Sequence, residues 1–315
     1  MRKLLGALIA LPLLLATAHA QSDYPTQPVT MVVGFPAGGG MDTIARIVSE
    51  RAAQELGQQI VVENRAGAGG TIAAAHAAGA RPDGYTIYLG ETSALYAPIV
   101  HGDVGYDPLE SFVAVAHLTS APLALVAHPD AGASNMQEFM DLVRASPGEY
   151  FYATSGIATI QHLAVEILQD MADLELEQVP FQGGSPSVAA VVSGEVPFGV
   201  VSLNAAVAQA ADENLIILGV TSAERVADFP DIPAISETVP DFAATPSQFV
   251  MAPAETPEAA IQALSAAIGA TMNDPEVIER LSAMGFNVDY MDGPALAAEL
   301  PAMTERWTAA AQASQ

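Results

Sequence analysis

The chain has 315 residues, no cysteine and a formal net charge of −26 at pH 7, from 36 acidic and 10 basic residues. Such an excess of negative charge argues against binding to nucleic acid or to an anionic membrane surface. Because no disulfide is available, a hydrophobic core must hold the fold together. The length is sufficient for a core divided between two lobes.

The first 20 residues have the order of a secretory signal peptide. The basic residues Arg2 and Lys3 precede an apolar run over residues 4–16, and Ala18-His19-Ala20 follows. This order predicts cleavage between Ala20 and Gln21. The apolar run is too short to span a bilayer, so we expect a soluble, exported protein. Removing two of the 10 basic residues leaves eight arginines against 36 acidic residues, a net charge near −28.

Residues 29–57 predict a strand, a glycine-rich turn and a helix. Residues 29–33 are apolar and mostly β-branched, and apolar residues recur at helical spacing from Ile44 to Leu56, with Gly57 as the stop. Asp42 is placed to cap the helix. A helix N-terminus behind glycines suits an anion, although a plain tight turn is the alternative. The pattern lacks Gly-x-Gly-x-x-Gly and the lysine of a phosphate loop, which disfavours a nucleotide.

The rest of the chain alternates strands and helices. Strands are predicted at 60–63, 85–89, 123–127, 150–153, 176–181, 196–201, 215–220 and 249–251. A turn at 154–159 repeats the architecture of the first one, and His162 follows near the start of its helix. Ser134 and Gln137 fit a capping box. Helices begin at Ser185-Pro186, Thr256-Pro257 and Asp274-Pro275, and a last helix covers 294–311.

This order predicts an α/β fold with two lobes, each a mostly parallel sheet flanked by helices. We expect residues 21–122 and 246–315 in the first lobe and residues 123–245 in the second. The chain crosses between the lobes near 121–124 and 244–248. In open α/β sheets, ligands bind at the carboxyl ends of the strands, where the glycine-rich turns lie.

Several motifs, in order, resemble the solute receptors of tripartite tricarboxylate transporters, also called the Bug family. They are Tyr24-Pro25-x-x-Pro28, the stretch from Phe35 to Asp42, Val62 to Gly70, Pro82 to Thr86, Tyr106-Asp107-Pro108, Val179 to Gly183, Val220 to Arg225 and Ala252 to Pro257. The resemblance implies a two-lobed periplasmic binding protein of type II that closes on a small carboxylate. It also implies delivery to two integral membrane subunits, by a receptor that we expect to be a monomer.

The resemblance implies that the first loop holds the ligand's carboxylate and that the turn at 154–159 grips the ligand from the second lobe. The expected ligand-binding residues are Phe35, Pro36, Ala37, Gly38, Gly39, Gly40, Asp42, Thr92, Ser93, Thr154, Ser155, Gly156, Thr159, His162, Phe181, Gln182, Gly183, Ser202, Asn204, Ser247 and Gln248. Family members often have Tyr-Lys-Gly where this chain has Phe181-Gln182-Gly183. A lysine and a phenol are therefore absent from this part of the expected pocket.

Other functions fit the sequence less well. A hydrolase using Ser155 or Ser185 with His162 lacks the Gly-x-Ser-x-Gly elbow and an acid that would orient the imidazole. The histidines lack the spacing of metal ligands, and His76 is interpreted as structural. We therefore expect no catalysis, no metal and no cofactor. A receptor that reports to a sensor kinase remains the alternative to a transport receptor.

Overall fold

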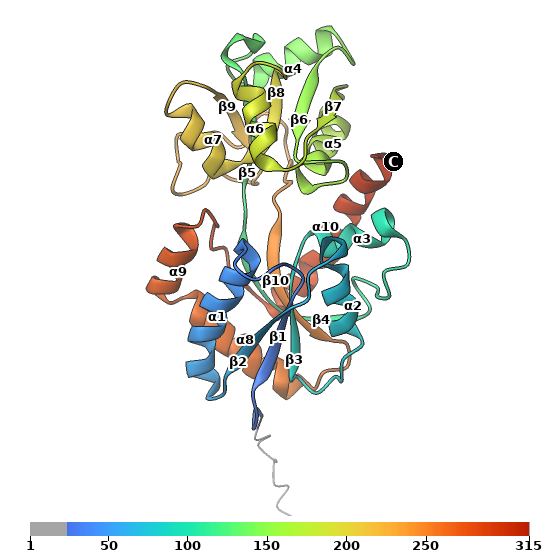
Figure 1. Cartoon of the computed structure of the whole chain (residues 1–315), viewed down its shortest axis with the longest axis vertical. Helices are drawn as coiled ribbons and strands as arrows, with labels where there is room; N and C mark the ends of the chain where they lie inside the picture. Colours follow the sequence, from blue (N-terminus) through green and yellow to red (C-terminus); the bar gives the residue numbers. More distant parts are fainter. Residues whose placement is uncertain (1–23, 315) are drawn as a thin grey trace, which may run out of the picture.

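The computed structural model describes residues 24–314 and contains two β-sheets, which lie one beyond the other along the long axis of the molecule (Figure 1). The first sheet has the order β11-β4-β10-β3-β1-β2. Its strands are β1 (Val29–Val33), β2 (Ile60–Asn64), β3 (Thr86–Glu91), β4 (Phe112–Ser120), β10 (Ser247–Pro253) and β11 (Met291–Asp292). Strands β2, β1 and β3 are parallel, whereas β10 runs antiparallel to both β3 and β4.

The second sheet has the order β7-β6-β8-β5-β9. Its strands are β5 (Leu123–Ala127), β6 (Phe151–Thr154), β7 (Glu177–Pro180), β8 (Phe198–Ser202) and β9 (Ile216–Val220). Strands β7, β6 and β8 are parallel, and β5 runs antiparallel to β8 and β9. The predicted α/β fold is confirmed. Both sheets are mixed, because β5 in the second sheet and β10 in the first run antiparallel to their neighbours. Each of these two strands follows a segment in which the chain passes from one sheet to the other.

Helices cover both sheets. The first sheet, with its helices, is called the first lobe below, and the second sheet, with its helices, the second lobe. The helices around the first sheet are α1 (Gly40–Leu56), α2 (Thr71–Ala78), α3 (Ser93–His101), α8 (Glu258–Met272), α9 (Pro275–Ser282) and α10 (Gly293–Ala313). Those around the second are α4 (Met136–Ala145), α5 (Ile160–Ala172), α6 (Gly184–Val192) and α7 (Leu203–Ala210). Short 3₁₀ turns lie at η1 (Ala68–Gly70), η2 (Pro129–Ala131) and η3 (Ile235–Glu237).

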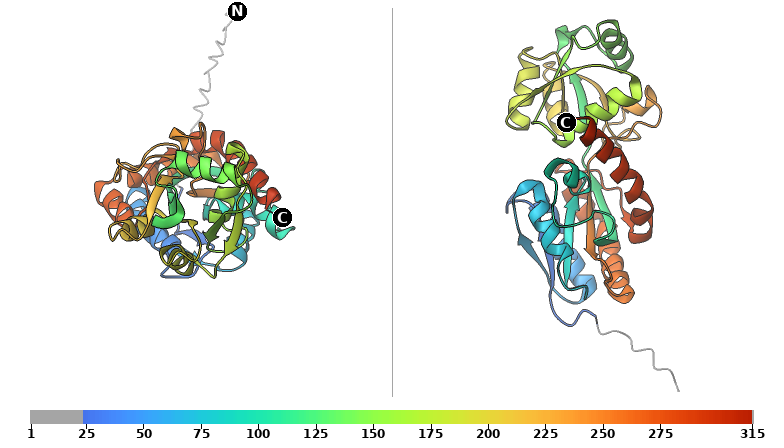
Figure 2. Two further views of the ribbon diagram at one scale, coloured as in Figure 1. Left: turned by 90° about the horizontal axis from the view of Figure 1, so that it is seen from above. Right: turned by 90° about the vertical axis from the view of Figure 1, so that its right-hand side faces the viewer.

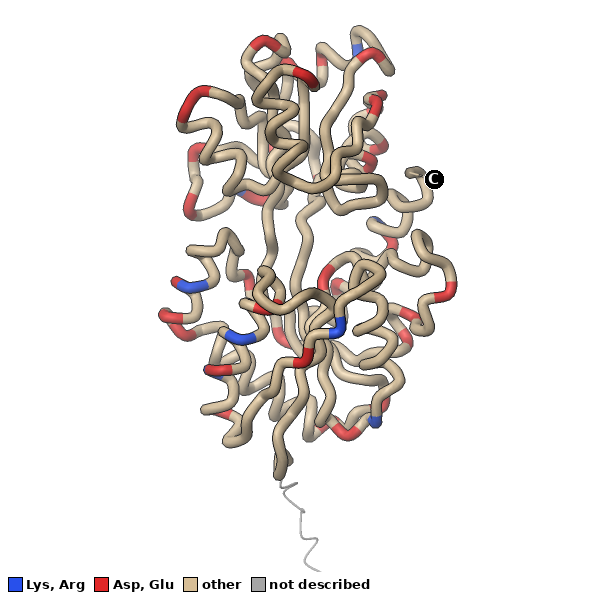
Figure 3. The backbone as a smooth tube through the Cα atoms, viewed as in Figure 1, with Lys and Arg blue, Asp and Glu red and all other residues tan. Residues whose placement is uncertain are grey.

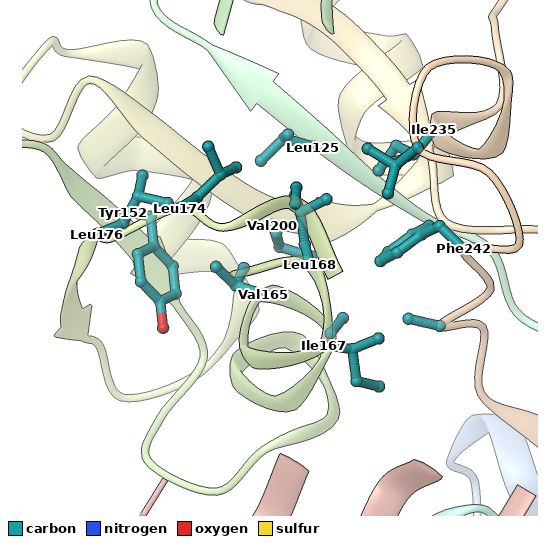
Figure 4. Packing of buried hydrophobic residues seen from close by; sticks show 14 of the residues in the cluster. Leu125, Tyr152, Val165, Ile167, Leu168, Leu174, Leu176, Val200, Ile235 and Phe242 are labelled. Carbon is teal, nitrogen blue, oxygen red and sulfur yellow. The ribbon is translucent and has the colours of Figure 1, made fainter. Parts of the chain in front are cut away.

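Each lobe has its own hydrophobic core. In the first lobe, the apolar stripe of α1, which includes Ile44 and Val48, packs on Met31 and Val33 of β1. In the second lobe, Val165 and Leu168 of α5 pack with the buried strand residues of the second sheet (Figure 4). These helices form because their apolar residues recur at helical spacing and are buried against a sheet. No helix within residues 24–314 is long and apolar enough to cross a membrane.

Two extended segments cross between the sheets. One passes through Ala121 and Pro122 from β4 to β5, and the other returns through Thr245 and Pro246 into β10. The segments are joined to each other, since the N–H of Ala121 donates to the carbonyl of Pro246 at 2.9 Å. Short, paired crossings of this kind form a hinge about which two lobes can rotate.

The last helix differs from the expectation that the chain after residue 246 lies wholly in the first lobe. Leu296 and Leu300 of α10 pack on the first sheet. Trp307, Ala310 and Ala311 instead join the core of the second lobe, and Figure 2 shows α10 running from one lobe to the other. Tyr96 of α3 stacks on Trp307, with ring centroids 6.2 Å apart. The last turns of α10 pack on α5 of the second lobe, and Trp307 also stacks on Tyr96 of α3 in the first lobe, so the end of α10 contacts both lobes.

Two local predictions need correction. Strand β4 is absent from the predicted elements, yet it is a mostly buried strand that lies between β11 and β10 in the first sheet. The capping box at α4 uses Asn135 rather than Ser134 as the N-cap, because Asn135 accepts from the N–H of Glu138 at 3.0 Å. Glu138, and not Gln137, completes it by accepting from the N–H of Ser134 at 2.9 Å.

Acidic residues are scattered over both lobes, with few basic residues among them (Figure 3). The predicted signal peptide, residues 1–20, lies outside the described residues. In the described part, several arginines form ion pairs with carboxylates, such as Arg51 with Asp274 and Arg225 with Glu237. These pairs leave the net negative charge of the surface in place.

Candidate ligand-binding site

The first loop lies between β1 and α1, at the carboxyl edge of the first sheet. Gly39 is the N-cap of α1, and its backbone is extended with φ −81° and ψ 173°. The N–H groups in the first turn of a helix have no partner within that helix. Here the first turn contains Gly40 and Met41, both at the wall of a cavity between the lobes.

Asp42 anchors this loop from within the first turn, and is therefore not the N-cap that the sequence predicted. Its Oδ2 accepts from the N–H of Gly38 at 2.9 Å and from Nε of Arg46 at 2.8 Å. Its Oδ1 accepts from Arg46 at 2.9 Å and from Asn64 at 3.0 Å. The hydrogen bonds from Arg46 are the main reason that the pKa of Asp42 is lowered to about 2. The ion pair of Asp42 with Arg46 therefore positions the loop, and the positive charge of Arg46 is already neutralised by Asp42.

We expect Asp42→Asn to lower the free energy of unfolding by about 1–2 kcal/mol at neutral pH, the scale of the pKa shift discounted for the half-exposed guanidinium. The folded carboxylate binds its proton more weakly than the unfolded one. Its stabilisation is therefore full above the ordinary pKa of 3.8 and is lost as the pH falls towards 2. Denaturant unfolding of wild type and variant at several pH values measures the difference, which should be constant above pH ~5 and shrink below pH ~4.

Glu237→Gln is the matched control, because Glu237 accepts a similar two-point contact from Arg225 at 2.7 and 2.8 Å on an exposed surface. We expect a smaller loss there, since exposed ion pairs contribute little. Equal losses in the two variants would mean that Asp42 is only a surface ion pair.

The second loop, at 154–159, is held by its own side chains. Thr159 is the N-cap of α5: its Oγ1 accepts from the N–H of His162 at 3.4 Å and donates to the carbonyl of Gly156 at 2.8 Å. His162 is buried, and its Nδ1 accepts from the N–H of Ala158 at 3.0 Å. The fully buried Thr154 accepts from Gly156 and from Gln178. Thr154 and His162 therefore lie behind the loop and shape it.

The two loops face one cavity of about 620 Å³ between the lobes. The N-terminal turn of α1 and that of α5, with Ile160 and Gln161, both lie at its wall. Of the described residues that line it, none is lysine or arginine. Two helix N-termini supply partial positive charge and free N–H groups, so this cavity suits an anion without a basic side chain.

The structure brings only part of the predicted site to this wall. The predicted residues that line the cavity are Phe35, Pro36, Gly39, Gly40, Ser93, Thr159 and Gln248. Ala37 and Gly38 belong to the same loop but do not line the cavity. Ser155 supports the wall, because its hydroxyl donates to Gln161 at 2.9 Å.

Other predicted residues lie elsewhere. Thr92 is fully buried, and its Oγ1 accepts from the N–H of Ser247 at 2.8 Å. Ser247 lines a different cavity, on the opposite face of β10 from Gln248. Asn204 lines a small cavity of about 210 Å³ near Gly285. None of these three residues lines the cavity between the two loops. The sequence could not show this, because their positions depend on contacts between segments that are distant in the chain.

A second cavity of about 540 Å³ lies on the second lobe and shares Gln161 with the first. Ser202 lines it, together with Gly184 and Ser185. The loop with Phe181, Gln182 and Gly183 immediately precedes Gly184. It is hydrogen-bonded to the 154–159 loop, because the N–H of Gly183 donates to the carbonyl of Ser155 at 3.2 Å. The predicted residues that line a cavity are thus spread over four cavities, and the first two of these share Gln161.

The sequence interpretation missed several residues at the first cavity. Glu91, Tyr96 and Gln161 line it, as do apolar residues from both lobes such as Ile157 and Phe286. Glu91 comes two residues after the predicted strand 85–89, at the carboxyl edge of the sheet, which was a usable signal. Tyr96 and Phe286 gave none, because their approach depends on how the lobes and α9 pack.

Comparison with known proteins identifies the family of this chain. Residues 44–313 match the family described as the Tripartite tricarboxylate transporter family receptor. The match begins two residues after Asp42, so the first loop itself lies just before it. This chain belongs to that receptor family. A UPF0065 protein of Bordetella bronchiseptica is 36% identical over 285 residues, which cover 90% of this chain and 84% of that protein.

Solved structures of similar receptors include two with bound dicarboxylates. MatC from Rhodopseudomonas palustris, with bound malate, is 29% identical, with a TM-score of 0.70 over 91% of this receptor and 100% of that chain. A protein of R. palustris with adipate is 28% identical, with a TM-score of 0.73 over 93% of this receptor and 98% of that chain. The receptor therefore shares its family and its two-lobed periplasmic binding-protein fold with carboxylate-binding proteins.

Proposed function

We propose that this receptor captures a small carboxylate in the cavity between its lobes, in the periplasm, and delivers it to the two membrane subunits of a tripartite tricarboxylate-type transporter. The observation that carries the proposal is the pair of helix N-termini, of α1 and α5, at one cavity that has no lysine or arginine among its described lining residues. The malate and adipate bound to similar receptors support the ligand class.

A thermal-shift screen of carboxylates tests the proposal. A ligand at 100 times its dissociation constant stabilises the folded protein by about 2.7 kcal/mol. For a protein of this size, that corresponds to a rise in Tm of roughly 5–10 °C. Ligands that raise Tm should be recovered chemically unchanged after incubation. A screen in which no carboxylate raises Tm, or one in which the ligand is converted, would contradict the proposal.

The alternative is a receptor that reports to a sensor kinase. It would have the same fold, cavity and charge, so the neighbouring genes must separate the two roles. Genes for two integral membrane subunits beside the receptor gene would support transport, and a sensor-kinase gene would support signalling.

We also propose that residues 21–122 and 246–315 form one lobe and 123–245 the other, apart from the end of α10, where Trp307, Ala310 and Ala311 pack in the core of the second lobe. A monomer would close on its ligand about the two crossings. Closure would bring Ser202, now at the second cavity, and the loop at 181–183, which precedes Gly184 of that cavity, toward the first loop. We expect small-angle scattering to show a smaller radius of gyration at saturating ligand. An unchanged radius at saturation would argue against closure from the conformation described here.

A further inference from the structure

Glu91 places a carboxylate in the cavity that is proposed to bind a carboxylate. It is the last residue of β3, and it lines the cavity between the lobes. Strand β3 pairs with β1, and Leu89 lies opposite Val33 in this pairing. Glu91 therefore lies at the same edge of the sheet as the loop that leads into α1.

The Glu91 side chain has one short hydrogen bond, from the hydroxyl of Ser93 at 2.8 Å. An ionised carboxylate can accept about four hydrogen bonds. None of the ion pairs in the described part of the chain includes Glu91, and burial raises the pKa of its carboxyl above the usual range. The other ionisable side chains at this cavity are Tyr96 and the exposed His101. Glu91 is half-buried, and withdrawing a carboxylate from water without a cation beside it is costly, which makes such a group a candidate for function.

The cavity thus offers two chemically opposite surfaces. The first turns of α1 and α5 provide N–H donors for an anion, and Glu91 provides an acceptor for a cation. A dicarboxylate would find no lysine or arginine for its second negative charge among the described lining residues, which include the carboxylate of Glu91. It would also be repelled by a protein with a net charge near −28 after signal removal. A ligand with one carboxylate and one ammonium has no net charge and matches both surfaces.

We propose that this receptor selects an amino carboxylate, whose carboxylate lies at the N-termini of α1 and α5 and whose ammonium group pairs with Glu91. This inference rests on the proposed capture of a carboxylate and narrows its class. It separates this receptor from the similar proteins with bound malate and adipate.

Calorimetry with matched probes tests the inference. Each pair has the same carbon chain with and without an amino group: γ-aminobutyrate and butyrate, aspartate and succinate, glutamate and glutarate. We expect the amino member of at least one pair to bind roughly 10- to 100-fold more tightly, the scale of a hydrogen bond to a charged group. In Glu91→Gln, the affinity ratio of that pair should fall to about 1, while the plain carboxylate binds as well as before or better.

Two further variants complete the test. Glu91→Asp keeps the charge and should retain part of the preference. Glu110→Gln removes an exposed carboxylate outside the cavity and should leave the ratio unchanged. Circular dichroism and Tm establish that each variant is folded.

The outcomes separate the two proposals. If plain carboxylates bind as tightly as their amino partners, the inference is overturned and carboxylate capture stands. An amino preference that survives in Glu91→Gln overturns the role of Glu91. If none of the six probes binds and the wider carboxylate screen is also negative, both proposals fail.

Discussion

Replacing Gly39 by valine is expected to weaken carboxylate binding by roughly 10- to 150-fold, because the branched side chain would occupy the space beside the N-terminus of α1 and remove a hydrogen bond to a charged group. Gly39 lines the cavity. Its extended backbone can be adopted by any residue. A Cβ there would lie 3.3 Å from the carbonyl oxygen of Pro36, so a shift of a few tenths of an ångström accommodates it. The variant should therefore fold.

Gly79→Val is the matched control for this prediction. Gly79 has a similar φ of −84°, and its Cβ would lie 3.5 Å from the carbonyl oxygen of Ala75, at the end of α2. It does not line the cavity. We expect both variants to lose a similar, small amount of stability and only Gly39→Val to lose affinity. Calorimetry with a carboxylate found in the thermal-shift screen measures this. Unchanged affinity in Gly39→Val would mean that the first loop is only a turn.

Much of the fold followed from local patterns. The strand at 29–33, the stripe of α1 and its stop at Gly57 were predictable, because each depends on residues that are neighbours in the chain. Gly57 has the left-handed φ of 70° that such a stop requires. The 123–127 strand was likewise predictable from its short apolar run.

Elements that depend on distant contacts were not predictable in the same way. Strand β4 was missed although it pairs with β10 and β11, because those partners are more than 120 residues away along the chain and its own run contains His117 and Thr119. The end of α10 packs on α5 of the second lobe, and its Trp307 stacks on Tyr96 of α3. Nothing near these residues in the sequence indicates either contact.

The same distinction applies to the candidate site. The loops at 35–40 and 154–159 were located because glycine and hydroxyl residues between a strand and a helix are a local signal. The individual roles were not. Asp42, Thr154 and His162 are polar residues in or beside the loops, but their hydrogen bonds turn inward and hold the backbone. Only three-dimensional packing distinguishes a residue that shapes a loop from one that faces the cavity.

The second large effect concerns the charge of the ligand. The described lining residues of the cavity include no lysine or arginine, and Asp42 neutralises Arg46 on α1. Attraction at long range is therefore unavailable, and the net negative charge should slow encounter at low salt. Main-chain N–H groups and hydroxyls act at short range and are screened little by salt. Replacing the gripped carboxylate with an amide should cost roughly 1.5–3 kcal/mol, about 10- to 150-fold in affinity.

Calorimetry on a carboxylate ligand and its primary amide, at low and at high salt, tests most directly whether the two helix N-termini bind the anion. We expect the acid to bind roughly 10- to 150-fold more tightly than the amide at both salt concentrations, with an affinity for the acid that holds or rises as salt is added. Equal affinities for acid and amide, or an affinity for the acid that collapses at high salt, would contradict this account of the site.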